Sequence, residues 1–210
     1  MPESSAVLRR DAERNRQLLL RTASDLMAEA GLQVSYEDIA RAAGTGMGTV
    51  YRRFPQRQDL IDALFSEHVD MVMGLAEEAA LQDDAWAGLV WFLERQLERE
   101  AAHRGLSELL RGREQSSDLV VQTRARMTPI ITDLIARAVR AEQLPPGVVP
   151  GDFVAVHLMV GSILDASRAF DPDLWRRALQ IGLAGLRHAD LPDPAPGNDI
   201  IDRLYGDYRK

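Results

Sequence analysis

The sequence contains no cysteine, and only 6% of its 210 residues are aromatic. The absence of cysteine excludes disulfide bridges, thiolate nucleophiles and zinc sites built on cysteine. Long apolar runs are also missing, since the longest, residues 153–164, is interrupted by polar residues and is too short to span a bilayer. The N-terminal residues lack the apolar segment of a secretion signal. We therefore expect a cytoplasmic protein without a membrane segment.

Residues that carry chemistry form no catalytic or metal-binding pattern. The four histidines are scattered, no pair has helical ligand spacing, and HExxH is absent. No constellation of serine, histidine and acid and no phosphate loop is found. We expect no catalytic residue, no metal and no cofactor, so an enzyme is the least favoured class of function.

The charge differs between the two ends of the chain. The whole chain carries a net charge of −7, which taken alone argues against a polyanionic partner. The first 60 residues nevertheless carry a net charge of +1, and residues 61–210 carry −8. This asymmetry weakly favours a nucleic-acid-binding N-terminal part.

Apolar residues recur at three- and four-residue steps along nearly the whole chain. This spacing predicts an all-α fold of about nine helices. The four helices nearest the N-terminus are expected at residues 9–30, 36–43, 47–54 and 58–80. Five more segments are expected beyond residue 81, and Pro129 either kinks one of them or starts a separate helix.

Residues 36–54 have the spacing of a helix-turn-helix. Ser35 and Asp38 resemble a capping box at the start of the first short helix. Ala40 is small enough for two helices to cross closely, Gly44 suits the turn, and Val50 anchors the second helix. A plain helical hairpin is the alternative. We favour DNA binding because Arg52, Arg53 and Arg57 follow without an intervening acid, as phosphate contacts require.

Three stretches of sequence together resemble the tetracycline-repressor (TetR-like) family of bacterial transcription regulators. They are SYEDIARAAG at 35–44, GTVYRRFP at 48–55 and Asp59-Leu60. The resemblance implies a three-helix DNA-binding domain followed by a helical ligand-binding and dimerisation domain, and no catalytic activity. The domains would span residues 9–57 and 58–189, with a proline-rich tail at 190–210.

The resemblance also assigns roles to residues of the motif. Tyr51 matches a tyrosine that contacts phosphate, Arg57 stands where a basic residue does the same, and Thr49 and Arg52 lie where backbone contacts are expected. Base edges would be read from the start of the second short helix. The expected DNA-contacting residues are Ser35, Thr45, Gly46, Met47, Thr49, Tyr51, Arg52, Arg53 and Arg57.

Two of these residues depart from the family pattern. Gly46 stands where serine is common, and Met47 stands where a polar or basic residue is common. Methionine cannot make a bidentate base contact, so its expected base partner is the methyl group of thymine. The weakened pattern supports a second hypothesis, that the protein is a helical dimer that binds a partner other than DNA.

The last two expected helices, at about 151–170 and 172–189, carry more apolar surface than one core needs. The first is apolar on nearly every side, and the second has two apolar stripes. The resemblance implies that this pair forms a four-helix dimer interface, and the alternative is a large monomeric core. The expected interface residues are Gly161, Leu164, Trp175, Leu179, Gly182 and Leu186.

The resemblance further implies a cavity for a small apolar or amphipathic effector among the middle helices. Candidates are bulky, adaptable or polar residues within apolar stretches. They are Met71, Trp86, Trp91, Phe92, Met127 and His157, although ordinary core packing is the stronger interpretation of each methionine and tryptophan. The favoured function is thus a homodimeric repressor that an effector releases from a palindromic double-stranded DNA operator.

Overall fold

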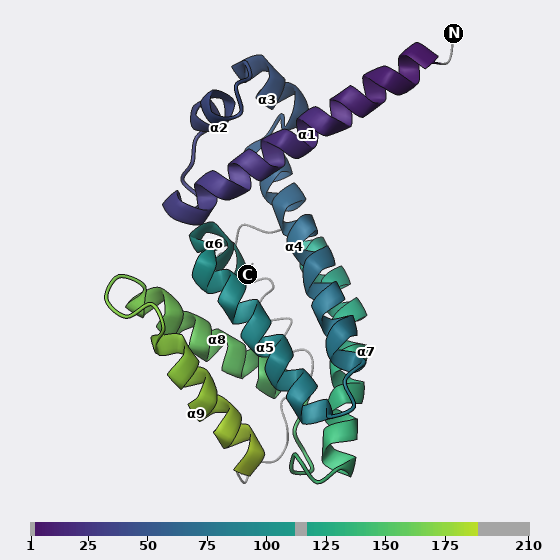
Figure 1. Ribbon diagram of the computed structural model, residues 1–210, viewed down its shortest axis with the longest axis vertical. Helices are drawn as coiled ribbons and strands as arrows, with labels where there is room; N and C mark the ends of the chain where they lie inside the picture. Colours follow the sequence, from purple (N-terminus) through teal and green to yellow (C-terminus); the bar gives the residue numbers. More distant parts are fainter. Residues whose placement is uncertain (1–2, 112–116, 189–210) are drawn as a thin grey trace. The chain divides into compact units, whose positions relative to one another are not determined.

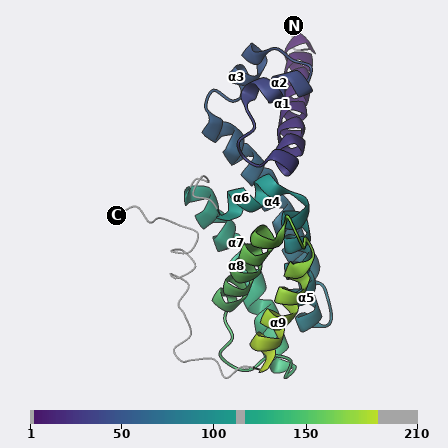
Figure 2. The ribbon, with the colours of Figure 1, turned by 90° about the vertical axis from the view of Figure 1, so that its left-hand side faces the viewer.

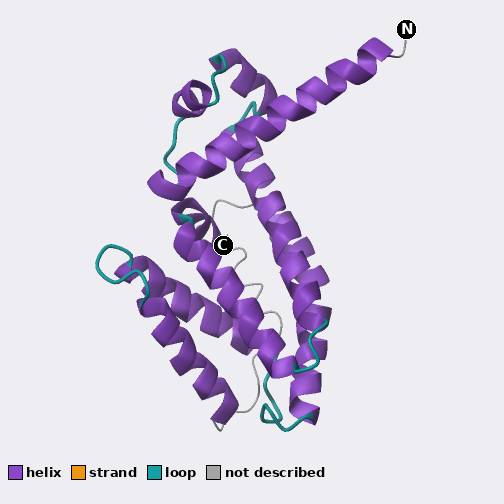
Figure 3. Ribbon diagram, viewed as in Figure 1, coloured by secondary structure: helices purple, strands orange, loops and turns teal. Residues whose placement is uncertain are grey.

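The computed structural model describes residues 3–111 and 117–188, and every regular element in these residues is an α-helix (Figure 3). The expected all-α fold is thereby confirmed. The helices are α1 (Glu3–Ala30), α2 (Tyr36–Ala42), α3 (Met47–Arg53), α4 (Arg57–Ala80), α5 (Ala85–Ala102), α6 (Arg104–Arg111), α7 (Ser117–Arg140), α8 (Pro150–Ser167) and α9 (Leu174–His188).

Several helix bounds differ from those predicted. The first helix begins at Glu3 rather than at residue 9, because polar residues can continue a helix that the apolar pattern does not mark. Pro129 lies inside α7, which runs unbroken across it, so a separate helix does not begin there. The last two helices are each a few residues shorter than expected. The expected tail at 190–210 lies outside the described residues.

The chain divides into two compact units. The first comprises Met1–Glu67 and His103–Gln115, and the second comprises His68–Ala102 and Ser116–Lys210. In the first unit α2 packs against both α1 and α3, as Figures 1 and 2 show. Its apolar centre includes Leu19, Ala23 and Val50, none of them measurably exposed.

The first unit also contains α6, which the sequence placed in the second domain. Gly105 lies so close to α1 that an added Cβ would be 2.7 Å from the carbonyl oxygen of Met27. The Glu108 carboxylate accepts a hydrogen bond from the Leu32 amide (2.7 Å), just after the end of α1. These contacts attach α6 to the C-terminal end of α1.

The second unit buries a continuous apolar core. Side chains from α4, α5, α7, α8 and α9 contribute to it, among them Leu89, Leu134 and Trp175. At one end, the Arg137 guanidinium donates to the carbonyl oxygens of Ala80 (2.7 Å) and Gln82 (2.5 Å) and so holds the end of α4 against α7. None of the described helices has the length and apolar character needed to cross a bilayer.

Candidate nucleic-acid interface

The turn between α2 and α3 has the geometry of a helix-turn-helix. Ser35 caps α2, and it forms a reciprocal capping box with Asp38. Ala40 and Val50 are 3% and 0% exposed, so they hold the two helices together as predicted. Gly44 has a φ of +63°, a conformation that glycine adopts at no steric cost. The sequence therefore places α3 at a fixed angle to α2.

The start of α3 carries few side-chain atoms. Gly46 is the N-cap residue and supplies no side-chain hydrogen bond, and Met47 begins the helix with 40% of its surface exposed. A Cβ added at Gly46 or Gly48 would meet no atom within 4 Å. The hydroxyl oxygen of Thr45 is buried in the turn, so the structure does not direct this atom towards a groove. Met47 is thus the exposed side chain of this first turn.

Tyr51 projects from α3 with 52% of its surface exposed. Its ring meets the ring of Tyr36 edge to face, with the centroids 5.1 Å apart. The hydroxyl of Tyr36 lies 2.9 Å from the carbonyl oxygens of both Phe54 and Gln56, to which it donates. Burial raises the pKa of Tyr36, and the negative charge of Asp59 adds to this effect. The hydroxyl therefore stays protonated, and its hydrogen bonds hold the segment that follows α3 in place.

No short-range pattern indicates this role for Tyr36. Its partners lie 18 and 20 residues further along the chain, beyond the reach of helical spacing, and both are backbone atoms that carry no side-chain signature.

The three arginines of the motif make no ion pair within the described residues, although two of them bond to other groups. Arg52 donates to the Thr49 hydroxyl oxygen (3.2 Å), and Arg57 donates to the carbonyl oxygen of Val34 (2.8 Å). Arg52, Arg53 and Arg57 are all exposed. Arg57 therefore also fixes the segment between α1 and α2, and its remaining N–H groups stay available. The surface of α3 is cationic where the sequence predicted it.

A histidine anchors α6 to α1 within the first unit. His103 Nδ1 accepts a hydrogen bond from the Leu106 amide (2.9 Å), and its Nε2 lies 3.0 Å from the hydroxyl oxygen of Ser24 on α1. An Nδ1 atom that accepts is unprotonated, so the proton is on Nε2, which donates to Ser24. The same side chain thus caps α6 and binds it to α1.

The candidate effector-binding residues all lie in the second unit. Phe92 and His157 are buried, and Met71, Trp86, Trp91 and Met127 are half-buried against its core. Nε2 of His157 on α8 lies 2.5 Å from a carboxylate oxygen of Glu100 on α5, which is completely buried. The protein itself therefore supplies a polar partner for His157.

Glu100 is not among the candidate residues predicted from the sequence. The run ERQLEREAA reads as a solvated surface, but Glu100 follows Leu93 and Leu97 on the same face of α5, at the spacing of a buried stripe. That register is the signal by which this carboxylate could have been found.

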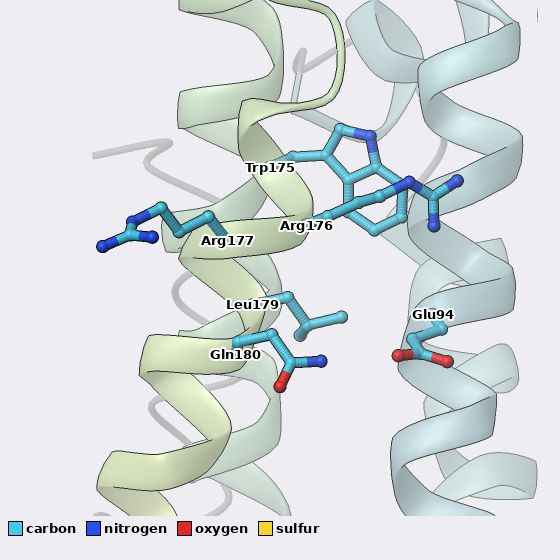
Figure 4. A pocket seen from close by; sticks show the side chains of 6 residues that line it. All are labelled: Glu94, Trp175, Arg176, Arg177, Leu179 and Gln180. Carbon is cyan, nitrogen blue, oxygen red and sulfur yellow. The ribbon is translucent and has the colours of Figure 1, made fainter.

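A pocket of about 420 Å³ opens between α5 and α9. Trp175, Arg176, Arg177, Leu179 and Gln180 line it from α9, and Glu94 faces them from α5 (Figure 4). The guanidinium of Arg176 lies 4.4 Å from the ring centroid of Trp175 and covers it. None of the six candidate effector residues lines this pocket.

The six residues expected at a dimer interface lie in the second unit, and their place in an interface stays a prediction. Each of them is buried or half-buried by other parts of the same chain; they are Gly161, Leu164, Trp175, Leu179, Gly182 and Leu186. A Cβ at Gly182 would lie 3.0 Å from a methyl carbon of Val156, so this glycine permits α9 to cross α8. Both stripes of α9 are apolar, and spacing alone does not tell which one faces its own core.

The opposite faces of α8 and α9 leave large apolar side chains exposed. Met159 and Ile163 on α8 are 56% and 37% exposed, and Ile181 on α9 is 64% exposed. Soluble proteins rarely leave such side chains grouped on adjacent elements unless something covers them. The unpartnered stripe of α9 is the one that contains Ile181.

Comparison with known proteins identifies the class to which this fold and surface belong. Residues 19–64 match the bacterial regulatory proteins of the tetR family, and residues 84–188, half of the chain, match the C-terminal domain of SbtR-like transcriptional regulators. The chain belongs to the TetR family and is a DNA-binding transcription regulator, not an enzyme.

Solved relatives share this architecture over most of their length. A TetR transcription regulatory protein from Mycobacterium vanbaalenii is 30% identical, and the match covers 86% of this chain and 99% of that one, with a TM-score of 0.56. The TetR regulator SCO0520 from Streptomyces coelicolor is 26% identical over 83% of this chain and 99% of its own, with a TM-score of 0.58.

A curated relative matches a shorter part. The HTH-type transcriptional regulator SAR0097 of Staphylococcus aureus is 34% identical over 89 residues, which are 41% of this chain and 46% of that protein. The chain thus spans less than half the length of this relative.

Proposed function

We propose that the protein is a homodimeric repressor that binds a palindromic operator through α3 and leaves it when a small effector binds. The observation that carries this proposal is the exposure of Met47, Tyr51, Arg52 and Arg53 on α3 and of Arg57 at the start of α4, where the three arginines make no ion pair within the described residues. A major groove of B-form DNA is wide enough to admit such a helix.

In this proposal the DNA contacts divide into two kinds. Thr49, Tyr51, Arg52, Arg53 and Arg57 would bind phosphates, which fix the register of the protein on DNA but carry no sequence information. Gly46 and Met47 would approach the base edges at the start of α3. Ser35, whose hydroxyl already bonds to Asp38 at the start of α2, would contact the backbone nearby.

The dimer would form through the exposed apolar faces of α8 and α9. A two-fold axis makes the same patch meet itself, so Met159, Ile163 and Ile181 of each chain would be covered by those of the other. Two copies of α3 related by such an axis match a palindrome whose half-sites are about one helical turn apart. In this arrangement the second chain covers the apolar stripe of α9 that the chain's own core leaves exposed.

The effector would bind within the second unit, which contains the six candidate effector residues. The transcriptional regulator FadR of Bacillus subtilis, which is 16% identical with a TM-score of 0.63, was solved in complex with stearoyl-CoA. Stearoyl-CoA is the ligand of FadR. For the present protein it supports only the proposal that the effector is an amphipathic compound. An effector would release DNA to the extent that it binds the DNA-incompetent state more tightly.

Selection of bound duplexes from a random DNA pool tests this function. The proposal predicts enrichment of one palindromic sequence, and release of that duplex by a subset of small apolar or amphipathic compounds. If no sequence is enriched over non-specific binding, the proposal is wrong, and the partner-binding alternative gains support.

A further inference from the structure

The three consecutive positions 46–48 at the start of α3 offer the DNA a single side chain. Gly46 and Gly48 flank Met47 on both sides, and open space surrounds the position of a Cβ at either glycine. No neighbouring side chain from these two positions shares the space around Met47, which is 40% exposed at the first position of the helix. Of positions 46–48, only Met47 has a side chain that can contact a base edge, and its contacting group is a thioether.

The chemistry of methionine limits what can be read. A thioether has no hydrogen to donate and is a weak acceptor, so it cannot satisfy the donor and acceptor groups by which most base edges are distinguished. The apolar feature of the major groove is the 5-methyl group of thymine. The methionine side chain has three rotatable bonds and adapts its shape to an apolar neighbour.

We propose that Met47 makes the regulator select a pyrimidine that carries a 5-methyl group, at one position of each operator half-site. This inference rests on the proposed function, because it assumes that α3 enters the major groove. In unmodified DNA the recognised base is thymine. The same methyl group occurs on 5-methylcytosine, so the chemistry predicts that methylated cytosine at this position restores part of the recognition.

Neighbouring residues of α3 are less suited to this role. The Thr49 side chain is half-buried, and its hydroxyl oxygen accepts a hydrogen bond from Arg52. Tyr51 lies one turn further along the helix, with its ring held against that of Tyr36. Thr49 nevertheless carries a methyl group, so it must be tested as a rival reader.

The experiment uses the full-length protein and a duplex chosen by selection. Each thymine in one half-site is replaced in turn by uracil, which differs only by the missing methyl group, and affinity is measured by fluorescence anisotropy at fixed salt. One position is expected to weaken binding by about fourfold, the effect of losing one buried methyl-sized group. Replacement at the matching positions of both half-sites should weaken it by about fifteenfold.

Variants identify the side chain that reads the methyl group. Met47→Ala should bind the thymine duplex more weakly and no longer distinguish it from the uracil duplex at that position. Met47→Leu, which stays apolar, should keep the preference. Thr49→Ser removes the Thr49 methyl group and keeps its hydroxyl, and it should leave the preference intact. Because Met47 is exposed, thermal unfolding should show that Met47→Ala folds like the wild type.

A second set of binding measurements distinguishes the effect of the methyl group from that of the rest of the base. At the sensitive position a C·G pair should bind weakly, and 5-methylcytosine in that pair should recover about fourfold in affinity.

The outcomes separate this inference from the proposed function. If no duplex is enriched, the proposed function fails. If a selected duplex binds but uracil has no effect at any position, or if Met47→Ala retains the thymine preference, the inference is wrong while operator binding stands. Loss of the preference in Thr49→Ser would reassign the methyl contact to Thr49.

Discussion

Ser35 and Asp38 show how single residues determine where α2 begins. The Ser35 hydroxyl oxygen accepts from the Asp38 amide (3.1 Å), and the Asp38 carboxylate accepts from the Ser35 hydroxyl (2.5 Å) and amide (3.3 Å). These bonds satisfy donors that every helix start leaves without partners. The side-chain hydrogen bond from Ser35 is the main cause that lowers the pKa of Asp38 below its ordinary 3.8.

Replacement of Ser35 by alanine should destabilise the first unit. Loss of a serine N-cap typically costs about 1 kcal/mol, so the free energy of unfolding measured in urea at pH 7 should fall by about that amount. Equal stability of variant and wild type at neutral pH would contradict this role.

Acid should remove part of this stabilisation. The pKa of Asp38 is lower in the folded chain than in the unfolded chain, so its contribution is fully present above the ordinary value of 3.8 and is lost as the pH falls through the lowered value. The stability difference between Ser35→Ala and the wild type should therefore be smaller in urea titrations at pH 3 than at pH 7. A stability difference that grows towards acid pH would contradict the conclusion that folding lowers the pKa of Asp38.

Local residues were predictable from the sequence, and long-range partners were not. The capping box at Ser35 and the left-handed glycines Gly31 (φ +77°) and Gly44 follow from spacing and residue type. The bonds of Tyr36 to carbonyl oxygens and of Glu108 to the Leu32 amide join residues far apart in sequence. No short-range pattern encodes such pairs.

At the scale of elements, the attachment of α6 to α1 depends on a glycine at the crossing. A Cβ at position 105 would lie 2.7 Å from the Met27 carbonyl oxygen and 2.8 Å from the Met27 Cβ, so α6 or α1 would have to move. The sequence marked α6 by its own pattern but contained nothing to assign it to the first unit rather than the second.

Two glycine-to-alanine variants should have opposite effects. Gly105→Ala should lower stability by about 1–3 kcal/mol, the usual cost of forcing extra volume into a packed site. Gly74→Ala, at a helical position where a Cβ meets nothing within 4 Å, should raise stability by about 0.5–1 kcal/mol. Thermal unfolding of both variants measures the difference. Equal melting temperatures would show that α6 does not pack on α1 as described.

The helices α8 and α9 show where periodicity stops being informative. It correctly indicated that α9 carries two apolar stripes and that the pair buries much apolar surface. It did not show which stripe faces inwards, because that choice depends on α5 and α8, which pack against α9 in three dimensions. The core uses Trp175, Leu179 and Leu183 and leaves Ile181 exposed.

At the scale of the whole molecule, the proposed dimer predicts a specific effect of charge at Ile181. Ile181→Glu should convert the dimer to a monomer in analytical ultracentrifugation, because each chain would bury an unpaired carboxylate against the apolar side chains of the other. Leu81→Glu is the matched control, since Leu81 is also apolar and is 84% exposed at the end of α4. If Ile181→Glu stays dimeric, or if Leu81→Glu dissociates the dimer, the proposed interface is wrong.

The distribution of charge makes DNA binding a local property of this molecule. The chain is acidic as a whole, and only its first 60 residues carry a small positive net charge. Long-range attraction is therefore weak, and affinity must come from a few close contacts between α3 and phosphates.

The dependence of operator affinity on salt tests this account most directly. The logarithm of affinity should fall steeply with the logarithm of salt concentration. Arg52→Ala and Arg53→Ala should each reduce the slope by about one per chain, and Arg140→Ala on α7 should not change it. A flat salt dependence, or a slope that both motif variants leave unchanged, would contradict the claim that α3 binds DNA through these arginines.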